Sequence, residues 1–172
     1  PCLSCLAAVI FMACGLWAVD SFSQNETAQT NTSAAAANVT ATVPAEQPTL
    51  SELLASARKA KDKKEFEKVY AYAKDAMDRF AQAARKEQKS LKDFPPSEQI
   101  PTYANLNDLA QIQFIKGEAL KDEGKKVEAV KAFELIISNF SYAQAWDPRG
   151  WFYKLATTSQ EAIDRMEGRD VE

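Results

Sequence analysis

The sequence contains no histidine, and its only cysteines are Cys2, Cys5 and Cys14. Without histidine, the chain lacks the commonest metal ligand and the commonest general base at neutral pH. The absence of thiols from Gly15 onward excludes a disulfide framework, a cysteine-based zinc site and a cysteine nucleophile in that part.

Acidic side chains do not form a recognisable catalytic pattern. Carboxylate pairs such as Glu65/Glu67 and Asp75/Asp78 stand among lysines, without the apolar pocket that a general acid needs. Because phosphate-binding and serine-nucleophile motifs are also missing, we expect no enzyme, no cofactor and no metal.

Basic residues are missing before Thr49 and are unevenly distributed after it. Residues 58–92 hold 12 basic and 6 acidic side chains, whereas residues 93–172 hold 9 basic and 14 acidic ones. The chain as a whole has a net charge of −3, which is not the basic excess of a nucleic-acid-binding protein. The two regions could orient a charged partner, or they could simply be solvated helix faces.

An uncharged apolar run, LSCLAAVIFMACGLWAV, covers residues 3–19. It is shorter than the roughly 20 residues of a membrane-spanning helix, so residues 1–23 are expected to be a signal peptide or a membrane anchor. Three fates are open: cleavage near Ser21–Ser23, lipidation of Cys14 after a weak lipobox-like Phe11–Cys14, or retention as an uncleaved anchor. The last two would hold the protein at a membrane.

Residues 24–48 are rich in Ala, Thr, Asn and Ser and carry almost no large apolar side chains. Such a segment cannot bury enough surface to offset its chain entropy, so we expect a disordered linker. Asn-x-Ser/Thr sequons occur here and once further on, at Asn25, Asn31, Asn38 and Asn139. They could carry glycans in a eukaryotic secretory protein, or they could be chance matches in a Thr-rich sequence.

Helical patterns begin at Thr49. Thr49 and Glu52 have the spacing of a capping box, which predicts a helix over residues 50–62, and a longer helix should follow over 65–91. Pro95, Pro96 and Pro101 then require a loop. The loop is followed by a third helix over 106–122, capped by Asn105, and by a fourth over 126–138.

A last helix is predicted over residues 148–167. Asp147 is expected to cap it, with Pro148 in its first turn and Gly168 at its end. It would cover the open face of the preceding helices.

Small residues recur at helix-contact spacing between Ala110 and Ala143. Gly117 is followed by Gly124, Ala129 and Phe133, and this pattern resembles a tetratricopeptide repeat. A weaker copy lies in the preceding hairpin, with small or apolar residues at the equivalent positions Ala57, Val69 and Ala76.

The resemblance implies an all-α fold of stacked helical hairpins, an α-solenoid of about five helices. Its hairpins would span 50–91 and 106–138 within a domain covering 49–172. An insertion, which extends the second helix and adds the proline-containing loop, would separate them.

Two sets of side chains are candidates for partner binding. The first is an aromatic cluster that could equally pack in the core, namely Tyr142, Trp146, Arg149, Trp151 and Tyr153. The second follows from the resemblance, because the first helices of successive repeats line a concave groove. This second set comprises Arg58, Lys61, Gln113, Lys116 and Lys121. These residues could equally be ordinary solvated surface.

The sequence thus favours a protein-binding scaffold of the bacterial cell envelope, in the periplasm or at the outer membrane. Its partner would be another envelope protein or a second copy of itself, and not a nucleic acid. Two alternatives remain open. One is a self-assembling structural subunit, and the other is an accessory domain that binds cell-wall polysaccharide by aromatic stacking.

Overall fold

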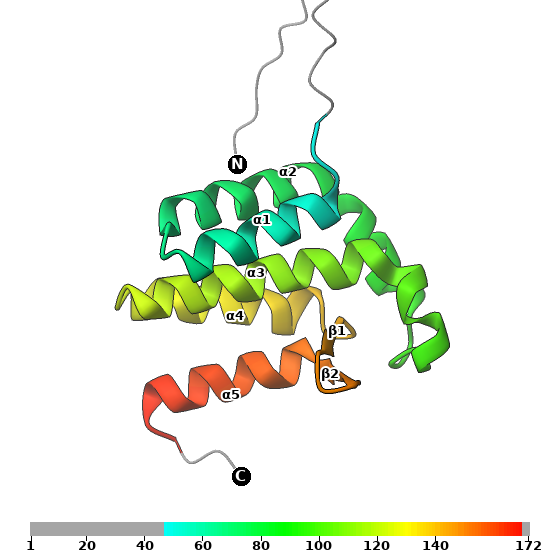
Figure 1. Ribbon diagram of the computed structural model, residues 1–172. Coiled ribbons are helices and arrows are strands. Elements are labelled where there is room, and N and C mark those ends of the chain that lie inside the picture. The colour runs from blue at the N-terminus through cyan, green and yellow to red at the C-terminus, as the bar shows by residue number, and fades with distance from the viewer. Residues whose placement is uncertain (1–46, 170–172) are drawn as a thin grey trace, which may run out of the picture. The chain divides into compact units, whose positions relative to one another are not determined.

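The computed structural model describes residues 47–169 and consists mainly of helices (Figure 1). The predicted all-helical character is confirmed in the main, since five α-helices make up most of the described part. The predicted signal or anchor, the linker, Cys14 and the first three sequons lie outside the described residues. The order of elements is α1 (Leu50–Asp62), α2 (Phe66–Ser90), the 3-10 helix η1 (Ser97–Tyr103), α3 (Ala104–Asp122), α4 (Lys126–Asn139), β1 (Gln144–Asp147), β2 (Trp151–Lys154) and α5 (Leu155–Glu167).

The start of α1 is the predicted capping box. The Glu52 amide donates to the Thr49 hydroxyl, and the Thr49 amide donates to the Glu52 carboxylate at 2.7 Å. The Thr49 amide and the Thr49 hydroxyl, which donates to the same carboxylate at 2.8 Å, lower the pKa of Glu52, because they favour its ionised form.

The turns α1–α2 and α3–α4 have the same structure. Lys64 has φ +57° and Gly124 has φ +77°, so both occupy the left-handed region. The next amide, of Glu65 or Lys125, donates to the carbonyl of Ala60 or Leu120 at 2.9 Å in each turn. The two turns therefore share one backbone conformation, which Lys64 adopts in the first turn and Gly124 in the second.

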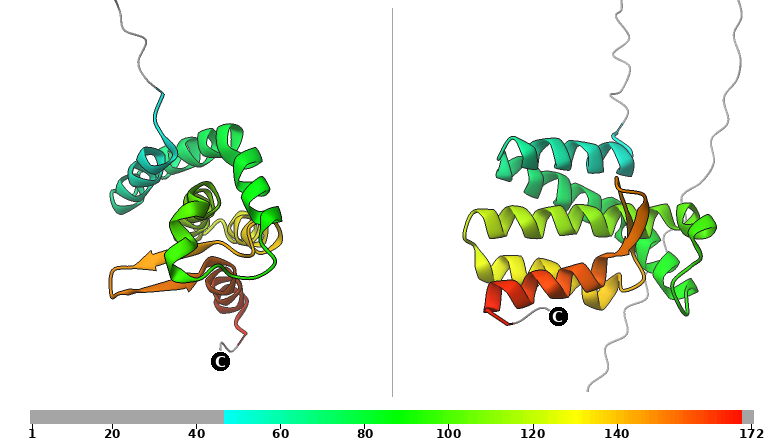
Figure 2. Two further views of the ribbon diagram at one scale, coloured as in Figure 1. Left: turned by 90° about the vertical axis from the view of Figure 1, so that its right-hand side faces the viewer. Right: turned by 60° about the horizontal axis from the view of Figure 1, so that its bottom comes forward.

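Helix α3 lies at the centre of the bundle, where it packs against α1, α2 and α4 (Figure 2). Helix α5 packs mainly on α4. A single large core joins these helices, and its largest fully buried side chains include Phe133, Phe140, Leu53, Leu106, Leu109 and Ile112.

Gly117 marks a close approach between α3 and α4. A Cβ atom built on Gly117 would lie 2.6 Å from Cε1 of Phe133, whose side chain is fully buried. Ala129 is also fully buried. The small residues of the repeat pattern thus leave room for a phenyl ring between the two helices.

The start of α3 differs from the prediction. The helix begins at Ala104, directly after η1, and Asn105 does not cap it. Instead Glu87 of α2 accepts hydrogen bonds from the Asn105 side chain (2.6 Å) and from the Leu106 amide (2.7 Å). A carboxylate from another helix therefore satisfies donors at this positive helix end.

The predicted helix over 148–167 is wrong in its first part. Residues 144–154 form an antiparallel hairpin, β1–β2, and α5 begins only at Leu155. Asp147-Pro148-Arg149-Gly150 is a tight turn in which the Gly150 amide donates to the Asp147 carbonyl at 2.9 Å and Gly150 has φ +110°. Asp and Pro open turns as readily as helices, and the glycine that follows favours the turn.

No helix among residues 47–169 is long and apolar enough to cross a membrane.

Candidate functional site

Exposed aromatic side chains gather at the end of the β1–β2 hairpin. The large apolar side chains that are exposed in residues 47–169 are Val127, Trp146 and Trp151, with relative accessibilities of 64%, 54% and 47%. Two of these three therefore lie in the hairpin, whereas Val127 stands alone in the first turn of α4.

The cross-strand pairing of the hairpin arranges these rings. Trp146 lies opposite Phe152, with ring centroids 4.9 Å apart and an edge-to-face arrangement of the two planes. Asp147 lies opposite Trp151, and the Arg149 guanidinium lies 4.5 Å from the centre of the Trp151 ring. Edge-to-face and cation–π contacts of this kind fix the ring orientations at the surface.

Asp147 and Arg149 hold the turn between the strands. The Asp147 carboxylate accepts the backbone amide and Nε of Arg149, each at 2.9 Å, and its Nη2 at 2.8 Å. These charge-assisted bonds lower the pKa of Asp147 to about 2. These bonds connect the two ends of the turn at the exposed tip of the hairpin.

The base of the hairpin is held by α3 and by the loop between α2 and η1. Asn107 of α3 accepts the Gln144 amide at 2.9 Å, and the Tyr142 hydroxyl donates to the Lys92 carbonyl at 2.9 Å. Phe94 meets the Tyr142 ring edge-on at 5.4 Å, and the Lys154 ammonium lies 4.1 Å from the centre of the Phe94 ring. The loop between α2 and η1 therefore positions the hairpin against the helices.

A pocket of about 320 Å³ opens beside the tip of the hairpin. We call it the tip pocket. It is built by α3, the hairpin and α5, and its lining residues are Phe114, Trp146, Asp147, Pro148, Arg149, Trp151, Tyr153 and Thr158. Tyr153 is half-buried, and burial raises its pKa against the opposing effect of the Arg58 charge.

The five residues of the aromatic cluster are brought together in part. Trp146, Arg149, Trp151 and Tyr153 line the tip pocket, whereas Tyr142 is half-buried at the base of the hairpin. Sequence reasoning missed Phe114, which joins the pocket from α3. Nothing in its local sequence distinguishes Phe114 from a core residue, and only the fold brings it beside the hairpin.

Three of the predicted groove residues are engaged with other side chains. Arg58 donates to the Gln111 side chain, Lys61 pairs with Asp122 at 3.3 Å, and Lys121 pairs with Glu118 at 2.8 Å. Arg58 and Lys61 therefore link α1 to α3, and Lys121 links one turn of α3 to the next. Near Arg58, burial raises the pKa of Asp108, and the Arg58 charge opposes this rise.

The other two predicted groove residues do not fit that surface. Gln113 is 3% exposed and donates to the Ala73 carbonyl of α2 at 3.1 Å, so the expectation that it faces outward is wrong. Lys116 lines a pocket between α2, α3 and α4 instead. Five residues along a helix correspond to a rotation of about 140°, so Lys116 lies on another side of α3 from Gln111.

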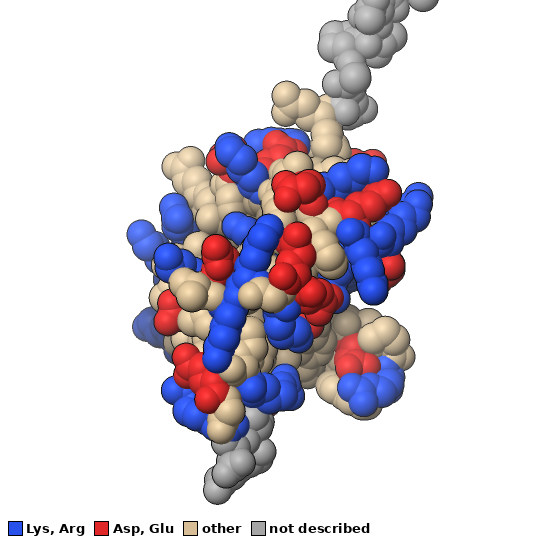
Figure 3. Space-filling model, turned by 90° about the vertical axis from the view of Figure 1, so that its left-hand side faces the viewer, with Lys and Arg blue, Asp and Glu red and all other residues tan. Residues whose placement is uncertain are grey.

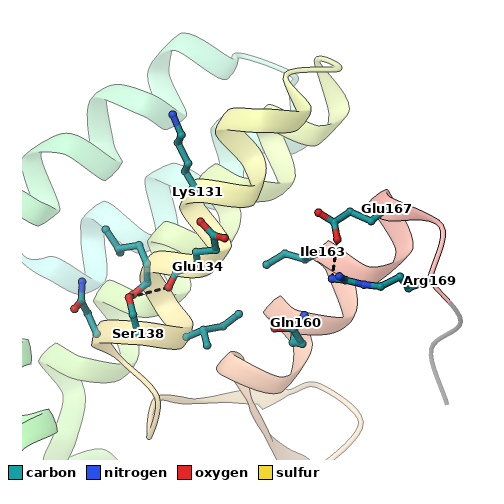
Figure 4. Close-up of a pocket in the computed structure, with 10 residues that line it drawn as sticks. Lys131, Glu134, Ser138, Gln160, Ile163, Glu167 and Arg169 are labelled. Carbon is teal, nitrogen blue, oxygen red and sulfur yellow. Dashed lines mark hydrogen bonds and ion pairs between the residues drawn. The ribbon is translucent and has the colours of Figure 1, made fainter.

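A second open groove, of about 740 Å³, lies between α4 and α5 (Figure 4). Lys131, Glu134 and Ser138 line it from α4, and Gln160 and Ile163 from α5. At its far end Arg169 pairs with Glu167 at 2.8 Å. This groove is larger than the tip pocket, but the described residues that line it include no aromatic side chain.

Within residues 47–169 no cluster of three or more acidic, histidine or cysteine side chains is arranged to hold a metal ion. Comparisons with protein-family models, with curated proteins and with solved structures give no match.

Proposed function

We propose that this protein is a non-enzymatic scaffold that binds another protein through the tip of its β1–β2 hairpin. The observation that carries the proposal is the exposure of Trp146 and Trp151 on a hairpin whose tip and base are both held in place. Tryptophan and arginine dominate the binding energy of protein interfaces, and a preorganised surface loses less entropy on binding.

The stacked helices support a tetratricopeptide-like role for the rest of the domain. The two helical hairpins share one turn geometry, and α5 follows as a fifth helix. In this proposal the helices are the support and the tip pocket is the main binding surface. The face near Arg58 and Lys61 is secondary, because these cations already have partners.

A place in the bacterial cell envelope is part of the same proposal. It is supported by the sequence alone, through the apolar run at residues 3–19 and the polar segment that follows it. The partner would accordingly be another envelope protein, or a second copy of this chain.

An affinity capture tests the proposal. The full chain would be immobilised and exposed to a solubilised bacterial envelope extract, beside the double variant Trp146→Ala/Trp151→Ala. Val127→Ala is the matched control, because it removes an equally exposed apolar side chain away from the hairpin. We expect a protein that is retained by the wild type and by Val127→Ala but lost from the double variant. Equal retention by all three would refute the proposal.

A further inference from the structure

Several hydrogen-bond donors of the tip pocket have no partner among the described residues. Within residues 47–169 the side-chain hydrogen bonds at the tip of the hairpin are those between Asp147 and Arg149. The indole N–H groups of Trp146 and Trp151 and the hydroxyl of Tyr153 form no hydrogen bond with any described residue, although all three residues line the pocket. These residues therefore keep donors that a ligand at the pocket could use.

The charged acceptor of the same surface is already engaged. Asp147 is the only carboxylate among the described residues that line the pocket, and both of its oxygens already accept from Arg149. The other side-chain acceptors of the lining are the hydroxyls of Tyr153 and Thr158, and the Thr158 hydroxyl donates to the Lys154 carbonyl. The ligand that fits best is thus rich in acceptors, poor in donors, and flat or apolar enough to lie on aromatic rings.

An extended proline-rich segment meets these conditions. Proline has no backbone N–H, and a polyproline II helix has no internal hydrogen bonds, so its carbonyls point outward as free acceptors. Aromatic-lined grooves bind such segments at low entropic cost, because the helix is already formed in the free peptide. A sugar is a poorer match, because each of its hydroxyls also donates and would need an acceptor.

We propose that the tip pocket binds a proline-rich, extended segment of the partner protein. This inference rests on the proposed function and specifies the chemistry of the partner. Trp146 and Trp151 would supply both ring surfaces and indole donors, while Phe114 and Tyr153 would form the inner wall.

The indole N–H resonances of the ¹⁵N-labelled full chain provide a direct test. The chain has three tryptophans, so Trp17 serves as an internal reference, and the variants Trp146→Phe and Trp151→Phe assign the other two signals. The probe is a proline decapeptide, with a Gly-Ser decapeptide of equal length as control. We expect the Trp146 and Trp151 signals to shift with the proline peptide only.

Two kinds of variant separate the contribution of ring stacking from that of the hydrogen bond donated by the indole N–H. Each Trp→Phe variant keeps a ring but loses the donor, and we expect its affinity for the proline peptide to fall about fivefold. Trp146→Ala/Trp151→Ala is expected to lose about 30-fold or more, while Val127→Ala retains the wild-type affinity.

The absence of any shift at millimolar peptide would overturn the inference. So would shifts caused by phosphatidylcholine vesicles or by a chitin tetrasaccharide but not by the peptide, since these would identify a bilayer or a sugar as the ligand. Capture of a partner through Trp146 and Trp151 that contains no proline-rich segment would leave the proposed function intact and overturn this inference alone.

Discussion

Lys64 and Gly124 occupy equivalent positions of the internal repeat, and both have positive φ. A side chain in the left-handed region costs roughly 1–2 kcal/mol, whereas glycine adds about 0.5–1 kcal/mol of backbone entropy in the unfolded chain. We therefore expect Lys64→Gly to stabilise the fold by about 0.5–1 kcal/mol, measured by urea unfolding. The reverse change, Gly124→Lys, is the matched control and should destabilise it by a similar amount. If Lys64→Gly destabilises the protein, its turn is not equivalent to that of Gly124.

Ser159 is fully buried in α5, and its hydroxyl has no hydrogen-bond partner in the described structure. An unpaired buried hydroxyl costs about 1–3 kcal/mol, and alanine is a better helix former than serine. We expect Ser159→Ala to raise the free energy of unfolding by about 1 kcal/mol. Thr157→Ala, an exposed change in the same helix, measures the helix-propensity contribution on its own. A loss of stability in Ser159→Ala would mean that the hydroxyl has a partner.

Gly117 has no space for a side chain, because its missing Cβ would lie 2.6 Å from the buried ring of Phe133. Overpacking of this kind costs about 1–3 kcal/mol for a small group. We expect Gly117→Ala to lower the thermal midpoint and Gly117→Leu to unfold the domain, as followed by circular dichroism. The double change Gly117→Ala/Phe133→Leu should recover part of the loss in Gly117→Ala. An unchanged midpoint for Gly117→Leu would mean that α3 and α4 do not pack as described.

Among the elements, the hairpin is expected to respond to acid through Asp147. The pKa of Asp147 falls from 3.8 to about 2 through its bonds to Arg149. A lowered pKa means that the carboxylate stabilises the folded turn at pH values above about 3.8, and that this contribution is lost as the pH falls through about 2. We expect the Arg149 Nε–H signal to shift over this acid range in an NMR titration. In the Asp147→Asn variant, which lacks the carboxylate, the Arg149 Nε–H signal should already differ from that of the wild type at neutral pH. A midpoint near 3.8 in the wild type would contradict the ion pair.

The helices were predictable from sequence because their signals are local. The capping box at Thr49, the prolines after α2 and Gly124 each act within a few residues, and the helices α1 to α4 begin and end close to the predicted limits. The hairpin was missed because Asp147-Pro148 suits a helix start as well as a turn. The decision between them depends on Gly150 and on contacts of the strands with Phe94 and Asn107, which are distant in the sequence.

The candidate site was predictable to a smaller degree. The concentration of aromatic residues predicts that some of them stay exposed, and the structure exposes Trp146 and also Trp151, which suited core packing equally well. The groove residues were less predictable, since the outward face of α3 depends on which helices cover it. The resemblance to a tetratricopeptide repeat predicts that Gln113 faces outward into a groove, yet Gln113 is buried and donates to the Ala73 carbonyl.

At the scale of the whole domain, folding brings the basic and acidic regions of the sequence together. Helix α2 from the basic region packs along α3 from the acidic region, and Lys61 pairs with Asp122 between α1 and α3. On the face that contains the helix turns, Lys and Arg side chains alternate with Asp and Glu (Figure 3). The charge asymmetry of the sequence is therefore not kept on this face.

The mixing of charge on this face argues against stacking of copies through it by electrostatic attraction, which is the mechanism that the charge asymmetry would offer to a self-assembling structural subunit. Charge-driven contacts need opposed patches of one sign, and they weaken as salt shortens the range of the interaction. We therefore expect static light scattering to give the full chain the same mass at about 20 mM and at about 500 mM salt. The Debye length is about 10 Å at 0.1 M salt, so charges are weakly screened at the lower concentration and strongly screened at the higher one. Lys61→Glu, which places two acids at the contact with Asp122, should destabilise the fold without changing the mass. A large mass at low salt that falls at high salt would instead favour the structural subunit. Assembly that persists in both salts but disappears in Trp146→Ala/Trp151→Ala would identify a second copy as the hairpin's partner.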